Sequence, residues 1–417
     1  MEIIKISKEE FDTFALEQDY YNIWQTSKYG AMAATLGYDV EYIAFKNQTK
    51  TVGASLVLSK LVYMGFKIHY MPRGMIINYS DKDLLKSALN ELKRFLFREK
   101  SLGIYLDPLV LKSTRNRKGE IIENYNTNDI FKIFRRAGAD YLERNLYFEG
   151  FHPRFYAYLN VTKKSPEKFF KSLSKQTKNK LRKSAKFGVE IFKDQTNNVE
   201  TLFSFISNYS KRPINYYQEL VNNFKEDCEI YYAKVNTEKY VQNSKILYEK
   251  EIEDNDYLTN TIQSTGYKGV SMRKVLNKKM ESDKVLASFK QHMVTSTDLL
   301  RNHPEGLIIG AVIVIKEKNT IHFFEEYQDK NYRNLNALTL LRWKILEKYL
   351  ELNIDKIDFG AVTGEFDKTK NMLFGLNEAK TAFQGQIEEY IGEFGIIINK
   401  TMYSLYAGSD EKQTLTI

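Results

Sequence analysis

The side chains best suited to binding phosphate gather in one short segment of the sequence. Between Lys163 and Lys186 there are ten basic residues and one acidic residue, Glu167, so the segment carries a net charge of +9. The whole chain of 417 residues also has a formal net charge of +9, which leaves the remainder close to neutral. Within a helix, cations four residues apart share one face and repel each other unless an anion compensates them. We expect this face to bind nucleic-acid phosphates or an anionic membrane surface, with an ordinary solvated face as the alternative; its residues are Lys175, Lys178, Arg182, Lys183 and Lys186.

Two arginines stand where they could bind a phosphate group. Arg212 and Tyr216 are four residues apart at the start of a predicted helix. The guanidinium offers a planar fork for a diphosphate and the phenol offers a hydroxyl donor, whereas a helix-capping ion pair is the alternative. Arg73, within the turn Pro72-Arg73-Gly74, either contacts phosphate or braces the turn.

Two aspartates end predicted strands. Asp107 precedes Pro108, and Asp358 lies in the sequence Ile357-Asp358-Phe359-Gly360. Strand ends of α/β domains face the ligand crevice, so either carboxylate could accept a hydrogen bond from a base, a sugar hydroxyl or an incoming amine. Both could instead pair with backbone amides in a turn, and for Asp358 we favour this structural role.

Several classes of chemistry lack the residues they need. The single cysteine, Cys228, sits in an apolar stretch and is expected to be buried rather than nucleophilic. The five histidines have no metal-ligand spacing, so we expect no metal, and none is suitably placed to act as a base. Phosphate loops of the Walker or dinucleotide type are absent. Without a recognisable signal peptide or an apolar run of about 20 residues, we expect a soluble cytoplasmic protein.

The elements that must position these residues form two similar units. Residues 1–146 read as mixed α/β, with strand-length apolar runs and an amphipathic helix over Asp83–Lys100. The order of strand, helix and strand recurs in residues 147–236 together with 304–417. Near the end, Ala382–Gly385 and Ile387–Ile391 are predicted to form a closing strand pair.

Residues 237–303 differ from both units. They are rich in Lys, Glu, Asp and Asn and have sparse apolar positions over Glu238–Ile262 and Val270–Leu300, separated by a turn at residues 265–269. We expect an antiparallel helical pair that projects from the second unit, each helix about 40 Å long. Two ordinary surface helices or a disordered insertion are the alternatives.

A series of short motifs runs along most of the chain. Its members are Trp24–Gly30, Tyr70–Gly74, Tyr105–Pro108, Thr177–Val189, Arg212 with Tyr216 and Tyr217, Ile357–Gly360, Gly375–Lys380 with Phe383, and Tyr390–Phe394. In this order, over about residues 20–395, the series resembles the Fem family of peptidoglycan aminoacyltransferases. Each motif is weak, but the series is specific.

This resemblance implies a fold and a reaction. The fold is α/β (α+β), with two GNAT-like domains in tandem and the second interrupted by a projecting coiled-coil arm. The donor is aminoacyl-tRNA, no cofactor is needed, and the acceptor is an amine on a peptidoglycan precursor linked to lipid or to UDP. Lys380, which spacing alone would leave as a solvated lysine, becomes the catalytic cation for the oxyanion or a contact to the tRNA terminal phosphate. Glu393 could hold or orient Lys380, and the base could be the substrate itself, through a ribose hydroxyl or a phosphate.

Two other functions stay open. A two-domain acyl-CoA N-acyltransferase would need a pyrophosphate loop, of which the sequence has no convincing copy. A non-catalytic RNA-binding protein would use only the basic patch and the arm. Peripheral contact with the inner membrane face would suit a lipid-linked acceptor, and the sequence leaves the oligomeric state open.

Overall fold

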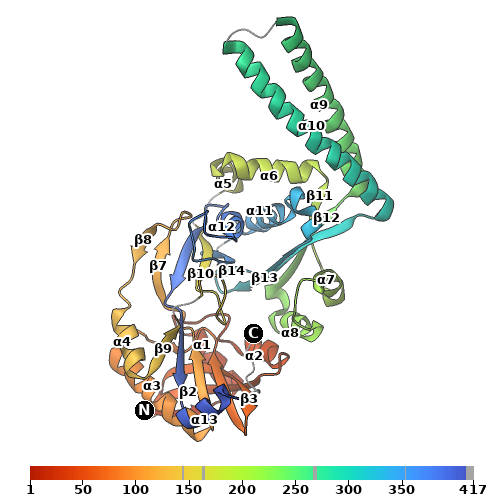
Figure 1. Cartoon of the computed structure of the whole chain (residues 1–417). Coiled ribbons are helices and arrows are strands. Elements are labelled where there is room, and N and C mark those ends of the chain that lie inside the picture. Colours follow the sequence, from red (N-terminus) through yellow and green to blue (C-terminus); the bar gives the residue numbers. More distant parts are fainter. Residues whose placement is uncertain (143–144, 162–164, 266–269, 353, 410–417) are drawn as a thin grey trace.

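The computed structural model describes residues 1–142, 145–161, 165–265, 270–352 and 354–409. They form two α/β units, one built around each of two sheets, and a long helical arm on the second unit (Figure 1). The predicted fold class, tandem α/β units with an arm inserted in the second, is confirmed.

The first sheet has the strand order β1-β2-β3-β4-β6-β17-β9, with β5 paired to β3. Helix α3 shows why the sequence folds this way, because Asp81 caps it by accepting from the Leu84 amide and its apolar stripe, including Leu89 and Leu92, is fully buried. The strands are β1 (Glu2–Lys5), β2 (Asp39–Asn47), β3 (Lys50–Tyr63), β4 (Phe66–Met71), β5 (Ile76–Ile77), β6 (Ser101–Leu106), β9 (Ala139–Leu142) and β17 (Glu393–Ile397). The helices of this unit are α1 (Lys8–Leu16), α2 (Ser27–Ala34), α3 (Lys82–Arg98), α4 (Asn128–Arg136) and α13 (Lys400–Ala407).

The second sheet has the order β11-β12-β13-β14-β15-β10-β16-β7-β8. Its strands are β7 (Leu111–Arg115), β8 (Ile121–Asn124), β10 (Phe155–Asn160), β11 (Val189–Lys193), β12 (Cys228–Val235), β13 (Leu307–Glu317), β14 (Thr320–Gln328), β15 (Lys356–Val362) and β16 (Gln386–Tyr390). The helices are α5 (Pro166–Ser172), α6 (Lys175–Lys186), α7 (Val199–Ile206), α8 (Ile214–Phe224), α11 (Ala337–Tyr349) and α12 (Phe374–Lys380), with short 3-10 turns at Lys225–Asp227 and Lys330–Leu335.

The two sheets exchange strands. Strands β7 and β8, from the sequence of the first unit, extend the second sheet, and β17, from the end of the chain, lies between β6 and β9 of the first sheet. The predicted domain limits, residues 1–146 for the first and 147–236 with 304–417 for the second, therefore stay a prediction. The two sheets do not follow these limits, because β7 and β8 cross them in one direction and β17 crosses them in the other. The units also share a core, in which Tyr29 and Met32 of α2 belong to one cluster with Tyr217 and Leu220 of α8.

The predicted closing strand pair is wrong. Residues Ala382–Gly385 form a turn, and β16 pairs with β10 and β7 instead. Directly after β16, Gly392 adopts a φ of +96°, a conformation that favours glycine, and the chain passes into β17 of the other sheet. A pattern of two neighbouring apolar runs cannot show that they belong to different sheets.

The arm consists of α9 (Thr237–Thr265) and α10 (Val270–Asn302), which run side by side away from the second unit (Figure 1). The turn predicted at residues 265–269 falls on 266–269, outside the described residues. At the base, Tyr240 and Leu299 are buried in the core of the second unit, and the Tyr240 hydroxyl is 2.7 Å from His292 Nδ1. Farther out, Ser282 donates to Glu251 at 2.6 Å, joining the two helices. The base of the arm is thus part of the folded unit.

Candidate active site

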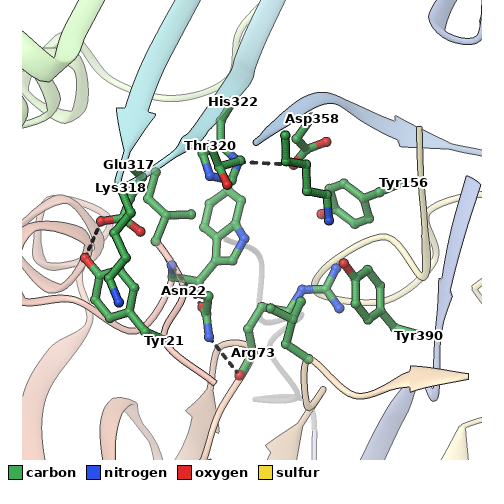
Figure 2. Close-up of a pocket in the computed structure, with 14 residues that line it drawn as sticks. Tyr21, Asn22, Arg73, Tyr156, Glu317, Lys318, Thr320, His322, Asp358 and Tyr390 are labelled. Atoms are coloured by element: carbon green, nitrogen blue, oxygen red, sulfur yellow. Dashed lines mark hydrogen bonds and ion pairs between the residues drawn. The ribbon is translucent and has the colours of Figure 1, made fainter. Parts of the chain in front are cut away.

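A cavity of about 440 Å³ lies where the two units meet. Trp24 and Tyr29 line it from the first unit, and most of its wall comes from β14, β15 and α12 of the second unit and from residues 148–153 between them. A smaller cavity of about 200 Å³ adjoins it, and both are lined by Trp24, Tyr156, His322 and Asp358. Figure 2 shows this smaller cavity, with Arg73 directed towards Tyr390 on one side and His322 joined to Asp358 on another.

Lys380 lies in the wall of the larger cavity, at the end of α12. Its ammonium donates to the Phe359 carbonyl at 2.6 Å and lies 3.2 Å from Oε2 of Glu326. Gly360 makes room for it, because a Cβ at that position would stand 2.7 Å from Nζ. Gly360 also has a φ of +84°, so two features of this bend require glycine.

A second cation shares the same carboxylate. Arg342 of α11 donates to both oxygens of Glu326, from Nε at 2.6 Å and from Nη2 at 2.7 Å. Burial raises the pKa of Glu326, but the charges of Arg342 and Lys380 outweigh this and hold it at about 2. Burial lowers the pKa of Lys380, and the charge of Glu326 opposes that effect. Overall the pKa of Lys380 is lowered, because burial and the Arg342 charge together outweigh the Glu326 charge; its contacts with Glu326 and the Phe359 carbonyl favour the ammonium form.

Asp358 holds a histidine in the wall of both cavities. Its Oδ2 lies 3.1 Å from Nδ1 of His322 on the neighbouring strand β14, and its Oδ1 accepts from the Gly360 amide at 2.7 Å. Burial raises the pKa of Asp358, and the contact with His322 lowers it below the ordinary value overall. Three consecutive residues of β15, Asp358 to Gly360, therefore position both a histidine and the Lys380 ammonium.

Asp107 lies behind the cavity wall in a buried polar cluster. It accepts from the Tyr70 hydroxyl at 3.0 Å and from the Arg73 amide at 2.8 Å, and its Oδ2 is 3.1 Å from Nδ1 of His152. His152 itself lines the larger cavity and packs against Trp24, with 4.7 Å between ring centroids. Burial lowers the pKa of His152 despite the nearby Asp107 charge, which favours the neutral ring. The Tyr70 hydroxyl also lies 2.5 Å from Nδ1 of His152, so Asp107 is linked to the cavity through Tyr70 and His152.

Arg73 braces the turn and also lines the smaller cavity. Its guanidinium carbon lies 5.2 Å from the ring centroids of both Tyr156 and Tyr390, and one of its nitrogens donates to the Pro153 carbonyl. Its Nε is buried without a hydrogen-bond partner among the described residues. Both alternatives offered by the sequence, a turn brace and a ligand contact, are compatible with this placement.

Glu393 lies beside Asp107 rather than Lys380. It accepts from the Phe151 amide at 3.0 Å, and its side chain is buried. Burial, reinforced by the Asp107 charge, raises the pKa of Glu393 to about 7. The carboxylate that orients Lys380 is Glu326, which the sequence analysis did not select because it lies 54 residues away on another element.

Arg212 reaches the larger cavity, and Tyr216 does not line it. The Arg212 guanidinium pairs with Glu325 and lies over the Tyr216 ring, 4.8 Å from its centroid. Tyr216 is buried beneath it in the shared core. Arg212 Nε is buried with no hydrogen-bond partner among the described residues, whereas the side chain as a whole is 33% exposed, so a ligand can reach the guanidinium but not this atom.

The five basic residues of α6 lie apart from this cavity. Helix α6 runs along the second unit beside the base of the arm (Figure 1). Arg182, Lys183 and Lys186 line a separate groove there, whereas Lys175 and Lys178 are not among its lining residues. The predicted site residues therefore fall into a cavity group and a surface group.

The expectation that no histidine is suitably placed is wrong. His152 and His322 both line the larger cavity, each with Nδ1 against an aspartate that the sequence did single out. The separations of 45 residues from His152 to Asp107 and 36 from His322 to Asp358 hide both pairs from local pattern reading.

The described residues give little support to a reactive thiol, a metal site or a membrane-spanning helix. Burial raises the pKa of the Cys228 thiol to about 12. Within residues 1–409, less the gaps given above, no cluster of three or more His, Cys, Asp or Glu side chains could hold a metal ion. In the same part of the chain, no helix has both the length and the apolar character needed to cross a membrane.

Known proteins resemble this chain over almost its whole length. The sequence profile of the FemAB family matches residues 6–410. Aminoacyltransferase FemA of Staphylococcus epidermidis strain RP62A is 23% identical over 417 residues, covering 97% of this chain and 98% of the relative. Aminoacyltransferase FemA of Staphylococcus aureus strain MRSA252 is also 23% identical, with 97% of each chain covered. A crystal structure of FemX superposes with a TM-score of 0.67 at 18% identity, covering 99% of this chain and all of the other, which shows a shared fold.

Proposed function

Because the chain belongs to the FemAB family, we propose that it is an aminoacyltransferase that moves an amino acid from aminoacyl-tRNA to an amine of a peptidoglycan precursor. One observation carries the proposal: His322 and Lys380 both line the same cavity, and residues 358–360 position both of them. Transfer of an acyl group to an amine needs a proton acceptor and a group that stabilises an oxyanion. These two side chains supply both.

The first step is attack of the acceptor amine on the carbonyl carbon of the tRNA ester. As the C–N bond forms, the amine must lose a proton. Asp358 holds the Nδ1 side of His322, which leaves Nε2 to accept that proton. When the intermediate collapses, the C–O bond to the ribose breaks and the ribose oxygen takes the proton back from His322. The products are an amide and a free tRNA hydroxyl.

Lys380 acts on the negative charge that develops between these events. An ammonium has three donors, and Lys380 donates to the Phe359 carbonyl and forms an ion pair with Glu326. These are its polar partners within the described residues, which leaves a donor for the carbonyl oxygen of the ester. Since the cation is held in place before the reaction and is largely shielded from water, its interaction with the oxyanion needs little reorganisation.

The other predicted residues suit substrate binding. Arg212, whose side chain is 33% exposed, lines the larger cavity and Arg73 lines the smaller one, so both suit contact with the phosphates of a lipid-linked or UDP-linked precursor. Asp107 orients His152, and Tyr216 supports the Arg212 guanidinium from below. A tRNA ester is already activated, so the proposed reaction requires no cofactor, and it takes place in the cytoplasm where charged tRNA is found.

A reconstituted transfer assay tests this proposal. Purified protein is incubated with tRNA charged with labelled amino acid and with a lipid-linked or UDP-linked precursor, and label in the precursor is measured. Label in the precursor that depends on charged tRNA is the expected result. Acetyl transfer from acetyl-CoA without tRNA would instead indicate an acyl-CoA enzyme. Salt-sensitive tRNA binding, with no labelled product from either the lipid-linked or the UDP-linked precursor, would indicate an RNA-binding protein.

A further inference from the structure

A groove of about 470 Å³ lies between α6 and the base of the arm, away from the cavity described above. Its apolar lining comes from three helices: Phe187 ends α6, Leu247 belongs to α9, and Val285 and Phe289 belong to α10. Val285 is 37% exposed, so the apolar lining is open to the surface. The groove is thus a junction of separate elements and not a gap within one helix pair.

Four cations surround this apolar lining. Arg182, Lys183 and Lys186 come from α6 and Lys284 comes from α10. The lining residues include no acid, and none of these four cations forms an ion pair within the described part of the chain. Elsewhere on the described surface some lysines do pair, as Lys239 does with Glu190 and Lys279 with Asp283. The groove therefore presents uncompensated positive charge next to apolar side chains.

Lys183 shows that this charge is directed into the groove. Its ammonium lies 5.6 Å from the centroid of the Phe187 ring, and burial lowers its pKa. Keeping an unpaired ammonium partly away from water is unfavourable unless an anion joins it. The arrangement fits a ligand in which a phosphate is covalently joined to an apolar chain.

We propose that this groove binds the phosphate headgroup and adjoining methylenes of an anionic phospholipid and so docks the base of the arm on a membrane surface. A lipid offers negative charge and apolar chain in the same order as the groove offers cations and apolar side chains. RNA also offers phosphate, but its backbone carries no apolar chain for Val285 and Leu247 to contact. The proposal rests on the groove alone and not on the proposed transferase activity.

Vesicle binding by the full-length protein tests this proposal. The probes are phosphatidylcholine vesicles with and without phosphatidylglycerol, and the fraction of protein that sediments with them is measured. We expect binding only to vesicles that contain phosphatidylglycerol. The double variant Lys183→Gln with Lys284→Gln should weaken partition on the order of ten-fold or more, since each cation near an anionic surface contributes about 1 kcal/mol.

Two further variants distinguish lipid binding in the groove from attraction by the positive charge of the surface as a whole. Val285→Ser changes no charge and lies at an exposed position, so the protein should stay folded while vesicle binding falls measurably. The control Lys175→Gln with Lys178→Gln removes the same charge from α6 outside the groove and should have the smaller effect. An equal loss in the control together with no effect of Val285→Ser would overturn the proposal. Salt-sensitive binding of uncharged tRNA through the groove cations, without vesicle binding, would overturn it as well.

Discussion

Lys380 Nζ lies 3.2 Å from the same Glu326 oxygen to which Arg342 donates from Nη2 at 2.7 Å. One carboxylate is therefore shared by two buried cations. Removing the only partner of a buried charge usually costs several kcal/mol, but here Arg342 stays with Glu326 when Lys380 is replaced. Lys380 can be changed without leaving a bare carboxylate in the core.

The first prediction concerns this replacement. Lys380→Met keeps an aliphatic side chain of similar length and removes the ammonium. Turnover in the transfer assay should fall on the order of 10²-fold or more, because a positioned oxyanion donor is lost. The melting temperature should change little. The surface variant Lys344→Met serves as the control, and a rate for Lys380→Met equal to that control would refute the catalytic role.

The second prediction concerns His322 as the proton acceptor. His322→Ala should reduce turnover by about 10²- to 10⁴-fold, the usual contribution of a positioned general base. The substitution enlarges a cavity that already has about 440 Å³, so added imidazole should enter it and restore part of the rate. His303→Ala, at an exposed position, should be neither slowed nor stimulated by imidazole. A His322→Ala enzyme with full activity would show that the substrate supplies its own base.

The third prediction is a pH dependence of stability that comes from Glu393. Its pKa rises from the ordinary 4.5 to about 7 on folding, so between these values the folded protein holds a proton that the unfolded chain has lost. The contribution of Glu393 is fully present below about pH 4.5 and is lost as the pH rises through about 7, by about 3 kcal/mol at most.

Glu393→Gln tests this sign. The amide keeps an acceptor for the Phe151 amide and removes the charge next to Asp107. Urea unfolding at about pH 5 and about pH 8 should show that the wild-type protein loses more stability than the variant between the two conditions. Parallel pH profiles for the two proteins would contradict the raised pKa.

Local sequence signals predicted most of the elements. Ser165 caps α5 by accepting from the Lys168 amide, and Gly188 ends α6 at a φ of +73°. Such signals involve neighbours along the chain, so they can be read without knowing the fold. The exchanged strands β7 and β17 could not be found this way, because which sheet a strand joins depends on contacts more than 200 residues apart, such as Glu389 with Ser113.

The site was predictable to a similar extent. Motif resemblance selected Lys380, Asp358 and Arg212, and the fold brings all three to one cavity. It did not select Glu326 or His322, which lie on β14, because a carboxylate and a histidine in a strand have no local signature of their partners. Tertiary pairing, rather than residue type, distinguishes them from ordinary surface residues.

The last prediction concerns the ion cluster that joins the exchanged strand β7 to β16 of the second sheet. Glu389 of β16 accepts from Ser113 at 2.7 Å and from Arg115 Nε at 2.9 Å, both on β7, and pairs with Arg154, the residue before β10. Burial raises the pKa of Glu389, but these partners outweigh it and hold the pKa at about 2, so the group is ionised at neutral pH.

Glu389→Gln should therefore destabilise the protein by about 3 kcal/mol, because it leaves buried cations without their counter-charge. Urea unfolding measures this loss, and the exposed pair of Asp39 with Lys67, 2.8 Å apart, provides the contrast. Asp39→Asn should change stability by less than about 1 kcal/mol, since solvent screens an exposed pair. If both variants unfold at the same urea concentration as the wild type, the cluster does not stabilise the exchange, and the shared core of α2 and α8 must hold the two units together.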